Sequence, residues 1–396
     1  MGWPTQSLET VAAVIRGVSF DKSEVTAEPG EGLLPILRAG NISDALDTRS
    51  DLIWVPSTRV KPEQRLRPGD IAICMSSGSQ AVVGKSAPLR EDWSGSVGAF
   101  CAIIRPEQSR IDPEFLALYM RSETFRAWTR RSEGANIKNI RHSELLDVRI
   151  PVPPMDQQRH AVDLLSRSEN IVRMRREAEK KTKEIIPALF LDMFGDPATN
   201  PKGWENQPVG DVIRSAEYGT STKASEVESG VPVIRMGNVE STGRLSLTDL
   251  KYVVLPEDER RKYTLQSGDI LFNRTNSKDL VGKTGIWRGD TPAVAASYFI
   301  RVRLNEEIML PDYFWAFMNT SHMKSVLYLT ARGAIGQSNI NAQELRAFVV
   351  PSPPRSLQTT FARRVAEALE LEGQQSLASA TARTAFQSLL AGVFEG

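Results

Sequence analysis

The sequence predicts a mixed α/β protein of two repeated halves, each with a β-rich part followed by helices. Ordered matches recur about 200 residues apart, from Gly2-Trp3 with Gly203-Trp204 to Pro151 with Pro351. Short runs rich in β-branched and aromatic residues alternate with Gly, Pro, Ser and Asn, which is the pattern of strands joined by turns. Each half closes with a long charged segment whose apolar residues recur at helical spacing.

The composition is that of a globular protein with room for two domains or more. The chain has 396 residues, of which 41% are hydrophobic and 24% charged. Two cysteines exclude a disulfide framework and an all-cysteine zinc site. No apolar run reaches the roughly 18 residues of a membrane span, and the N-terminus lacks a signal-peptide pattern. We therefore expect a cytoplasmic protein, and a net charge of +1 is low for a DNA binder that works alone.

Each half follows the same order of elements. The predicted strands are PILRAG, GDIAICM, AVVGKSA and VGAFCAIIR in the first half, and PVIRMG, DILFNRT, VGKTGIW and SYFIRVRL in the second. A helix is predicted over 112–130 and over 311–329, since DPEF and PDYF are typical helix starts. A Gly-Ala loop, a last strand and a Pro-Pro stop follow in both halves.

A long helix is predicted to end each half. The first covers 155–186 and is expected to end or kink at Pro187; the second covers 356–393, where Gly373 weakens its middle. The apolar residues of the two helices are Ala161, Leu164, Leu165, Ile171, Val172, Ala178 and Ile185, and Phe361, Val365, Leu369, Leu377, Phe386 and Leu389.

A helix of about 32 residues spans roughly 50 Å, more than one small domain can cover. We therefore expect the two helices to bury their stripes on each other, antiparallel if a pseudo-two-fold axis relates the halves. The alternative, in which each helix packs on its own domain, is less favoured because charges crowd most of the first helix. The expected domains are 1–152 and 197–352, with long-helix regions at 153–196 and 353–396.

Two Gly-Lys pairs imitate a phosphate-binding loop. Gly84-Lys85-Ser86 and Gly282-Lys283-Thr284 both end like one, but Ser79 and Ser277 stand where its first glycine is required. The segment after the second pair reads as a strand, whereas phosphate binding needs a helix N-terminus there. A hairpin turn with an exposed lysine is the better interpretation of both.

No catalytic or metal site is predicted. The three histidines lie far apart, and neither Gly-x-Ser-x-Gly nor HExxH occurs. The Pro-Pro pairs read VPPM and SPPR, not the motif of amino-methyltransferases. Asp70 and Asp269 each follow a glycine and are expected in turns.

The remaining signal is a set of side chains suited to DNA, placed in loops. Arg and Lys suit guanine edges or phosphates, and Asn and Gln suit adenine edges. Any one of these residues is most simply a solvated loop residue, so the prediction depends on their recurrence in both halves. The predicted DNA-contacting residues are Arg38, Asn41, Ser77, Ser79, Lys85, Lys138 and Asn139, and Arg235, Asn238, Asn273, Arg274, Asn276, Lys278, Lys283, Gln337, Ser338 and Asn339.

The ordered, duplicated set of motifs resembles the specificity subunit of a type I restriction–modification enzyme across essentially the whole chain. The matching pieces are PVIRMGNV, SGDILFNRTNS with VGKTGIW, GAIGQSNI before VPSPP, and LFLDMFGDP; GANIKNIRHSEL in the first half fits less closely. The resemblance implies two target-recognition domains that each read one half of a split double-stranded DNA site. It also implies an antiparallel coiled coil that sets the spacing and docks two methyltransferase subunits.

The same resemblance implies that chemistry lies in other chains. S-adenosylmethionine would serve the methyltransferase subunits in adenine-N6 methylation, ATP and Mg would serve a separate motor-nuclease (restriction) subunit, and this chain would hold no cofactor. Two other hypotheses stay open. The chain could be a recognition module of another phage-defence system with different catalytic partners, or an enzyme with a cryptic nuclease or methyltransferase site.

Overall fold

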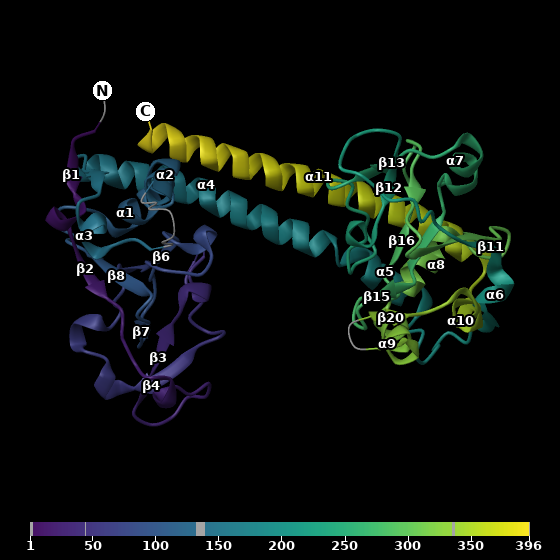
Figure 1. The fold of residues 1–396 in the computed structure, drawn as a ribbon, viewed down its shortest axis with the longest axis horizontal. Helices are drawn as coiled ribbons and strands as arrows, with labels where there is room; N and C mark the ends of the chain where they lie inside the picture. The colour runs from purple at the N-terminus through teal and green to yellow at the C-terminus, as the bar shows by residue number, and fades with distance from the viewer. Residues whose placement is uncertain (1–2, 44, 132–138, 335–336, 396) are drawn as a thin grey trace. The chain divides into compact units, whose positions relative to one another are not determined.

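The computed structural model describes residues 3–43, 45–131, 139–334 and 337–395, and the chain divides into two compact units (Figure 1). Unit 1 is Met1–Arg176 with Ala378–Gly396, and unit 2 is Glu177–Leu377. The end of the chain therefore returns to the unit in which the chain begins.

Unit 1 contains a four-stranded antiparallel sheet and two smaller sheets. The large sheet has the order β2 (Ala12–Arg16), β8 (Cys101–Pro106), β5 (Ile71–Cys74) and β6 (Ser86–Pro88). The second sheet is β4 (Ile53–Pro56), β3 (Leu33–Leu37) and β7 (Ser96–Val97), with β3 and β7 parallel. The third pairs β1 (Thr5–Ser7) with β9 (Arg149–Pro151), which joins the two ends of the β-rich part.

Unit 2 repeats this topology. Its large sheet has the order β11 (Ile213–Tyr218), β18 (Phe299–Leu304), β14 (Ile270–Asn273) and β16 (Thr284–Ile286). The smaller sheets are β13 (Lys251–Val253), β12 (Val231–Ile234) and β17 (Val294–Ala295), and β10 (Glu205–Pro208) with β21 (Val349–Ser352). A further sheet has the order β15 (Thr275–Asn276), β20 (Gln337–Asn339) and β19 (Arg332–Ala334). The same strand order in both units confirms the predicted repeat and the mixed α/β class.

The helix predicted after the strands is in fact two helices in each unit. These are α1 (Pro113–Tyr119) and α2 (Glu123–Arg131) in unit 1, and α8 (Pro311–Met318) and α9 (Ser321–Thr330) in unit 2. A new N-cap causes each break: Ser122 Oγ accepts a hydrogen bond from Phe125 N at 3.4 Å, and Thr320 Oγ1 accepts one from Met323 N at 3.2 Å. The other short helices are α3 (His142–Leu146), α6 (Val209–Val212), α7 (Glu257–Tyr263) and α10 (Ala342–Ala347).

Short 3-10 helices connect several strands. They are η1 (Leu8–Thr10), η2 (Lys22–Glu24), η3 (Ala39–Asn41), η4 (Ser57–Arg59), η5 (Pro62–Gln64), η6 (Gln80–Val82) and η7 (Met236–Asn238).

The long helices differ from the prediction in where they break. The first is α4 (Met155–Thr182), followed by α5 (Ile185–Phe194), while α11 (Arg355–Phe394) is continuous through Gly373. Pro187 does not end a helix, because it lies in the first turn of α5, where its missing N–H would have no helical partner in any case.

The apolar stripe of α4 is buried only in part. In unit 1, Leu165 and Val172 of α4 form a buried cluster with Phe386 and Leu390 of α11. Leu164 and Ile171, predicted in the same stripe, are 40% and 53% exposed. Since Ala161 belongs to the core of the β-rich part, α4 packs both on α11 and on its own domain.

In unit 2, the long helix α11 also packs on the core of its own domain. Phe361 and Val365 of α11 are buried in the core that includes the large sheet and α8. Phe190 and Phe194 of α5 meet Phe361 there, with ring centroids 5.9 and 5.1 Å away. The predicted anchor Leu377 is 70% exposed.

A buried glutamine holds the start of each long helix. Gln158 Oε1 accepts a hydrogen bond from Asp112 N at 2.8 Å, and its Nε2 donates to Pro153 O at 2.8 Å and to Arg110 O at 3.2 Å. Gln358 repeats this set with Leu310 N, Pro353 O and Ile308 O at 2.8, 2.9 and 3.1 Å. Each glutamine therefore ties its long helix to the loop before α1 or α8.

The first prediction concerns this glutamine. Gln358→Leu should lower the free energy of unfolding by about 3 kcal/mol or more, because three buried backbone groups lose their partner and each costs about 1–3 kcal/mol. Urea unfolding followed by circular dichroism measures the change. Gln374→Leu is the matched control, since Gln374 is exposed on the same helix and bonds only to Glu370. Equal unfolding midpoints for the two variants would show that the buried bonds do not hold the helix.

Candidate nucleic-acid interface

Two of the predicted loops of unit 2 meet although more than 60 residues separate them in sequence. Thr275 pairs with Asn339 and Asn276 with Ser338 in the antiparallel pair β15–β20. The Thr275 hydroxyl donates to Asn339 Oδ1 at 3.2 Å. We call residues 273–278 with 337–339 the loop pair of unit 2; it collects seven of the ten contact residues predicted in the second half.

Unit 1 brings the corresponding loops together. Ser76 forms an antiparallel bridge with Asn139, and Ile140 N donates to Met75 O at 2.8 Å. The matching bond in unit 2 runs from Ile340 N to Arg274 O at 2.9 Å. Residues 76–79 with 139 form the loop pair of unit 1, whereas the predicted contact Lys138 lies outside the described residues.

Two cations of the unit 2 loop pair lie over tyrosine rings. The Arg274 guanidinium carbon is 4.8 Å from the centroid of Tyr218, and Lys278 Nζ is 4.4 Å from that of Tyr328. Such contacts stabilise a cation by roughly 0.5–2 kcal/mol and fix its position. Sequence reasoning missed both tyrosines, because Tyr218 ends strand β11 and Tyr328 lies on helix α9, not in a predicted loop. The only feature that marks them as surface residues is the exposure of their side chains, 46% and 43%.

The predicted asparagines of this region are engaged with one another. Asn273 is fully buried, and its Oδ1 accepts a hydrogen bond from Asn276 Nδ2 at 3.1 Å. Asn276 Oδ1 accepts the backbone N–H of Ser277 at 2.9 Å. Asn339 is exposed, and Ser338 is buried. Asn273 therefore shapes the loop and offers no edge to a ligand.

Asn41 and Asn238 build turns. Each is 3% exposed, and its Oδ1 accepts the backbone N–H of the arginine three residues earlier, at 2.8 Å from Arg38 and 2.9 Å from Arg235. Their Nδ2 groups donate to backbone carbonyls, with Ser50 O at 2.8 Å in unit 1. This corrects the prediction of free amides at these positions.

The two arginines of these turns are held by the chain as well. Arg38 Nη2 donates to Asp51 O at 2.9 Å, and Arg235 Nη2 donates to Asp249 O and Oδ2 at 2.9 and 3.0 Å. Half of the Arg38 side chain remains exposed, against 30% for Arg235. Arg38 thus keeps more freedom to contact a ligand.

The two Gly-Lys turns differ in what their lysines do. Both connect antiparallel strands, with φ of +81° at Gly84 and +84° at Gly282, so the predicted hairpins are correct. Lys85 is exposed, as are Ser79 and, in part, Ser77. Lys283 instead donates to Met236 O at 3.0 Å and Val239 O at 2.5 Å, and burial lowers the pKa of its ammonium group. The prediction of an exposed lysine is therefore wrong at this position.

The predicted turn aspartates are buried and paired. Asp70 Oδ2 accepts the N–H of Arg67 at 2.8 Å and Asp269 Oδ2 that of Gln266 at 2.9 Å. Each also bonds to an arginine of the neighbouring strand, Arg105 or Arg303, at 2.8 Å. These carboxylates hold the turn before β5 and β14 and are not placed for acid–base chemistry.

The described part of the chain contains no cluster of three His, Cys, Asp or Glu side chains able to hold a metal ion. None of the helices formed by the described residues has the length and apolar character needed to cross a lipid bilayer.

The comparisons with known proteins agree on one family. The sequence profile of the type I restriction modification DNA specificity domain matches residues 1–184 and 201–371. The chain is 31% identical to the specificity subunit of the type I restriction enzyme EcoKI of Escherichia coli K12, over all of this chain and 89% of the relative. It is 30% identical to the StySPI specificity subunit of Salmonella potsdam, with the same coverage.

A solved structure shows the same fold. A chain from work on complex assembly and conformational transition of the type I R-M system superimposes with a TM-score of 0.62 at 17% identity, over 99% of this chain and 97% of that one. The two profile matches coincide with the two repeats of the topology. The chain belongs to the type I restriction–modification DNA specificity family.

Proposed function

We propose that this chain is the sequence-reading subunit of a type I restriction–modification system. It binds double-stranded DNA with a bipartite target, and each unit reads one half-site. The observation that carries the proposal is the recurrence of the loop pair. Two distant loops with hydroxyls and amides meet in both units, at the bridge between Ser76 and Asn139 in unit 1 and at the pair of Thr275 with Asn339 in unit 2, where Arg274 and Lys278 add positive charge.

The structure narrows the set of proposed contacts in unit 2. Arg274, Lys278 and Asn339 carry the reading there, with Asn276 beside them. Arg274 is the strongest candidate, because the Tyr218 ring fixes the position of its guanidinium group. Its Nε is buried, so the contact to a base would come from the terminal Nη atoms. An arginine held in this way is suited to the two acceptors of a guanine edge.

In unit 1 the proposed contacts are Ser77, Ser79, Lys85, Asn139 and Arg38. Lys138 and Gln337 are retained from the sequence alone, since no side-chain position is described for them. Asn41, Asn238 and Lys283 are removed, because the chain itself uses their polar atoms, and Asn273 is removed because its side chain is fully buried. Ser338 is buried, and Arg235 is largely engaged with Asp249.

Catalysis in this system belongs to partner chains. Two methyltransferase subunits, one per repeat, hold S-adenosylmethionine, and restriction subunits hold ATP and Mg. The duplication supports this stoichiometry, because two equivalent surfaces bind two equivalent partners.

A second prediction follows for the purified chain. Alone, it should transfer no methyl group and cut no DNA; with its methyltransferase partner it should methylate adenine and form a complex with two partner copies. Radioactive methyl transfer and native mass spectrometry measure both properties. A stable one-to-one complex at saturating partner contradicts the stoichiometry, and nuclease or methyltransferase activity of the isolated chain contradicts the assignment of roles.

A third prediction tests the reading by Arg274. Arg274→Ala should weaken recognition of the half-site read by unit 2 by about 1–3 kcal/mol, the discrimination of one bidentate base contact, and leave the other half-site unchanged. Sequencing of methylated adenines in cells with the variant system gives the half-site sequences and their extent of modification.

Lys262→Ala is the matched control for this variant. It removes another cation from a tyrosine ring, 5.2 Å from Tyr263, at the end of α7 and outside the loop pair. If both variants modify DNA with the same sequence preference and rate as the parent, Arg274 does not read the site.

A fourth prediction concerns the distance between half-sites. Both long helices cross the division between the units, at Arg176–Glu177 in α4 and at Leu377–Ala378 in α11. Inserting four residues at both points adds about 6 Å at 1.5 Å per residue and nearly keeps the helical phase. At about 3.4 Å per base pair, the spacer should lengthen by one or two base pairs.

The half-site sequences should stay the same in this variant, because no recognition loop is changed. An equal insertion between Glu306 and Glu307, in an exposed turn, serves as the control and should leave the spacer unchanged. Full activity with the original spacer in the helix variant would show that the helices do not set the distance.

A further inference from the structure

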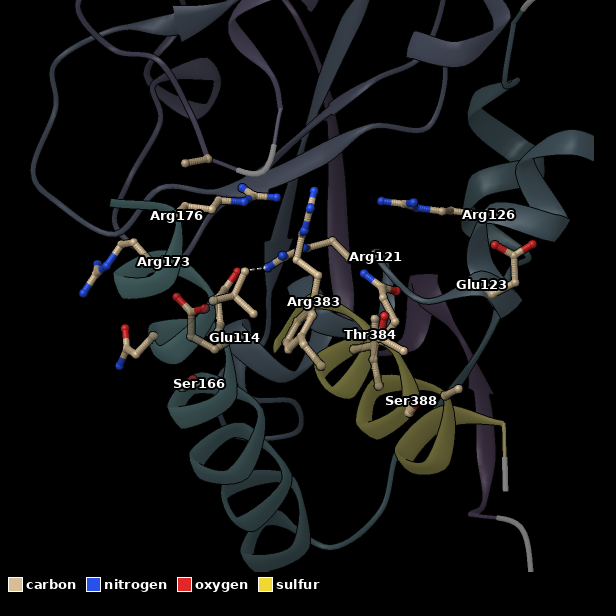
Figure 2. A pocket seen from close by; sticks show the side chains of 18 of the residues that line it. Glu114, Arg121, Glu123, Arg126, Ser166, Arg173, Arg176, Arg383, Thr384 and Ser388 are labelled. Carbon is tan, nitrogen blue, oxygen red and sulfur yellow. Dashed lines mark ion pairs between the residues drawn. The ribbon is translucent and has the colours of Figure 1, made fainter. Parts of the chain in front are cut away.

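Unit 1 contains an arginine-lined cavity that the proposed reading of bases does not use. It has a volume of about 1240 Å³ and lies between α2, α4 and the last four turns of α11 (Figure 2). All of its lining residues belong to unit 1. Six guanidinium groups line it: Arg90, Arg121, Arg126, Arg173, Arg176 and Arg383.

Two of these arginines are neutralised within the cavity. Arg90 makes two hydrogen bonds of 2.9 Å to Glu114, and Arg121 lies 2.6 Å from Glu169. Arg121 also lies over the ring of Phe386, 5.6 Å from its centroid. Arg90 also lies 3.8 Å from Glu169, so it links Glu114 of α1 to Glu169 of α4.

Three other arginines of the lining have no partner among the described residues. Arg126, Arg173 and Arg383 are exposed and have no hydrogen bond or ion pair with any described residue. The lining carboxylate of Glu123 is paired with Arg130 outside the cavity, which leaves Glu395 as an exposed acidic neighbour. In Figure 2, Arg126, Arg176 and Arg383 extend into the same space from three different helices.

The fold does not require this cluster. The equivalent glutamines Gln158 and Gln358 align α4 with α11, and this places Gly373 and Ser376 where α4 has Arg173 and Arg176. The N-caps Ser122 and Thr320 align α2 with α9, so that Lys324 corresponds to Arg126. Lys324 donates to Ser241 O at 2.8 Å and is thus engaged within the chain. The repeat that lacks the free arginines folds in the same way.

The cavity adjoins the Gly-Lys turn of unit 1, which carries the proposed contact Lys85. A Cβ built on Gly84 would lie 2.6 Å from the Thr129 side chain, so α2 packs directly against the turn that presents Lys85. Arg126 lies one helical turn before Thr129 on α2. Helix α2 therefore both lines the cavity and contacts the surface that we propose reads DNA. This continuity favours a nucleic-acid ligand over an acidic protein segment.

We propose that the cavity binds backbone phosphates of the DNA beside the half-site read by unit 1. This inference rests on the proposed function. Arg126, Arg173 and Arg383 hold the phosphate oxygens without reading sequence, with Arg176 beside them, since a planar guanidinium donates two parallel hydrogen bonds to such oxygens. The hydroxyls of Thr384 and Ser388, on the same wall as Arg383, can donate as well.

The test compares two triple variants of the full chain, each in complex with the methyltransferase subunits. The first is R126Q/R173Q/R383Q. The control is R159Q/R175Q/R364Q, which removes the same charge from exposed arginines of α4 and α11 that do not line the cavity. Fluorescence anisotropy measures affinity at 50–200 mM salt for a duplex with the mapped target and for one with both half-sites scrambled.

The cavity variant should bind both duplexes more weakly, and the control should bind like the parent. Each lost phosphate contact reduces the salt slope by about 0.9, so the fall in affinity between 50 and 200 mM salt should be about forty-fold smaller for three contacts. The ratio of affinities for the target and the scrambled duplex should stay the same.

Three results would overturn the inference. An unchanged affinity and salt slope would show that the cavity does not touch DNA. A loss of the methyltransferase subunits from the purified variant, with normal DNA binding when they are resupplied, would show that the cavity docks a protein. Equal losses in the control variant would show a general charge effect. Failure of the parent complex to prefer the target duplex would instead reject the proposed function, so the two failures are distinguishable.

Discussion

A buried glutamine near the start of each long helix is the contact on which the arrangement of each unit depends. Gln158 and Gln358 each bond to one N–H and two carbonyls that have no other partner among the described residues. Unpaired buried backbone groups are costly, so each glutamine fixes the start of its long helix against the loop before α1 or α8. The large sheet and the helix pair α1–α2 or α8–α9 are built against that helix, and the recognition loops extend from the same sheet.

The two repeats share their scaffold and differ in the side chains placed upon it. Strand order, turn glycines and the Asp–Arg pairs recur, because a packed core tolerates few alternatives. The loops are free to change: Lys85 is exposed where Lys283 is bonded to two carbonyls, and Cys74 stands where unit 2 has the buried Asn273. A protein that reads two different half-sites needs this combination of a constant frame and variable loops.

The net charge of +1 conceals a local separation of charge. Most carboxylates near the cavity of unit 1 are bound to Arg90, Arg121 or Arg130. Arg126, Arg173 and Arg383 of the same lining have no partner in the described part of the chain. Charge–charge interactions decay within a Debye length of about 8–10 Å at physiological salt. A phosphate group therefore responds to the nearest arginines and not to the total of the chain, and a near-neutral subunit can still hold DNA.

The sequence by itself determined the duplication, most strands, the hairpins at the Gly-Lys turns and the presence of two long helices, because spacing and turn chemistry are local properties. It placed the candidate contacts in loops, and the structure brings two of these loops together in each unit. Only the tertiary structure decided which of these side chains are free to contact a ligand. The amides of Asn41 and Asn238 are hydrogen-bonded within turns, whereas the Arg274 guanidinium lies over the Tyr218 ring. The tertiary structure was also needed to find the new helix starts at Ser122 and Thr320 and the arginine-lined cavity of unit 1. Burial and the meeting of distant side chains depend on non-local strand pairing, which no local pattern of residues encodes.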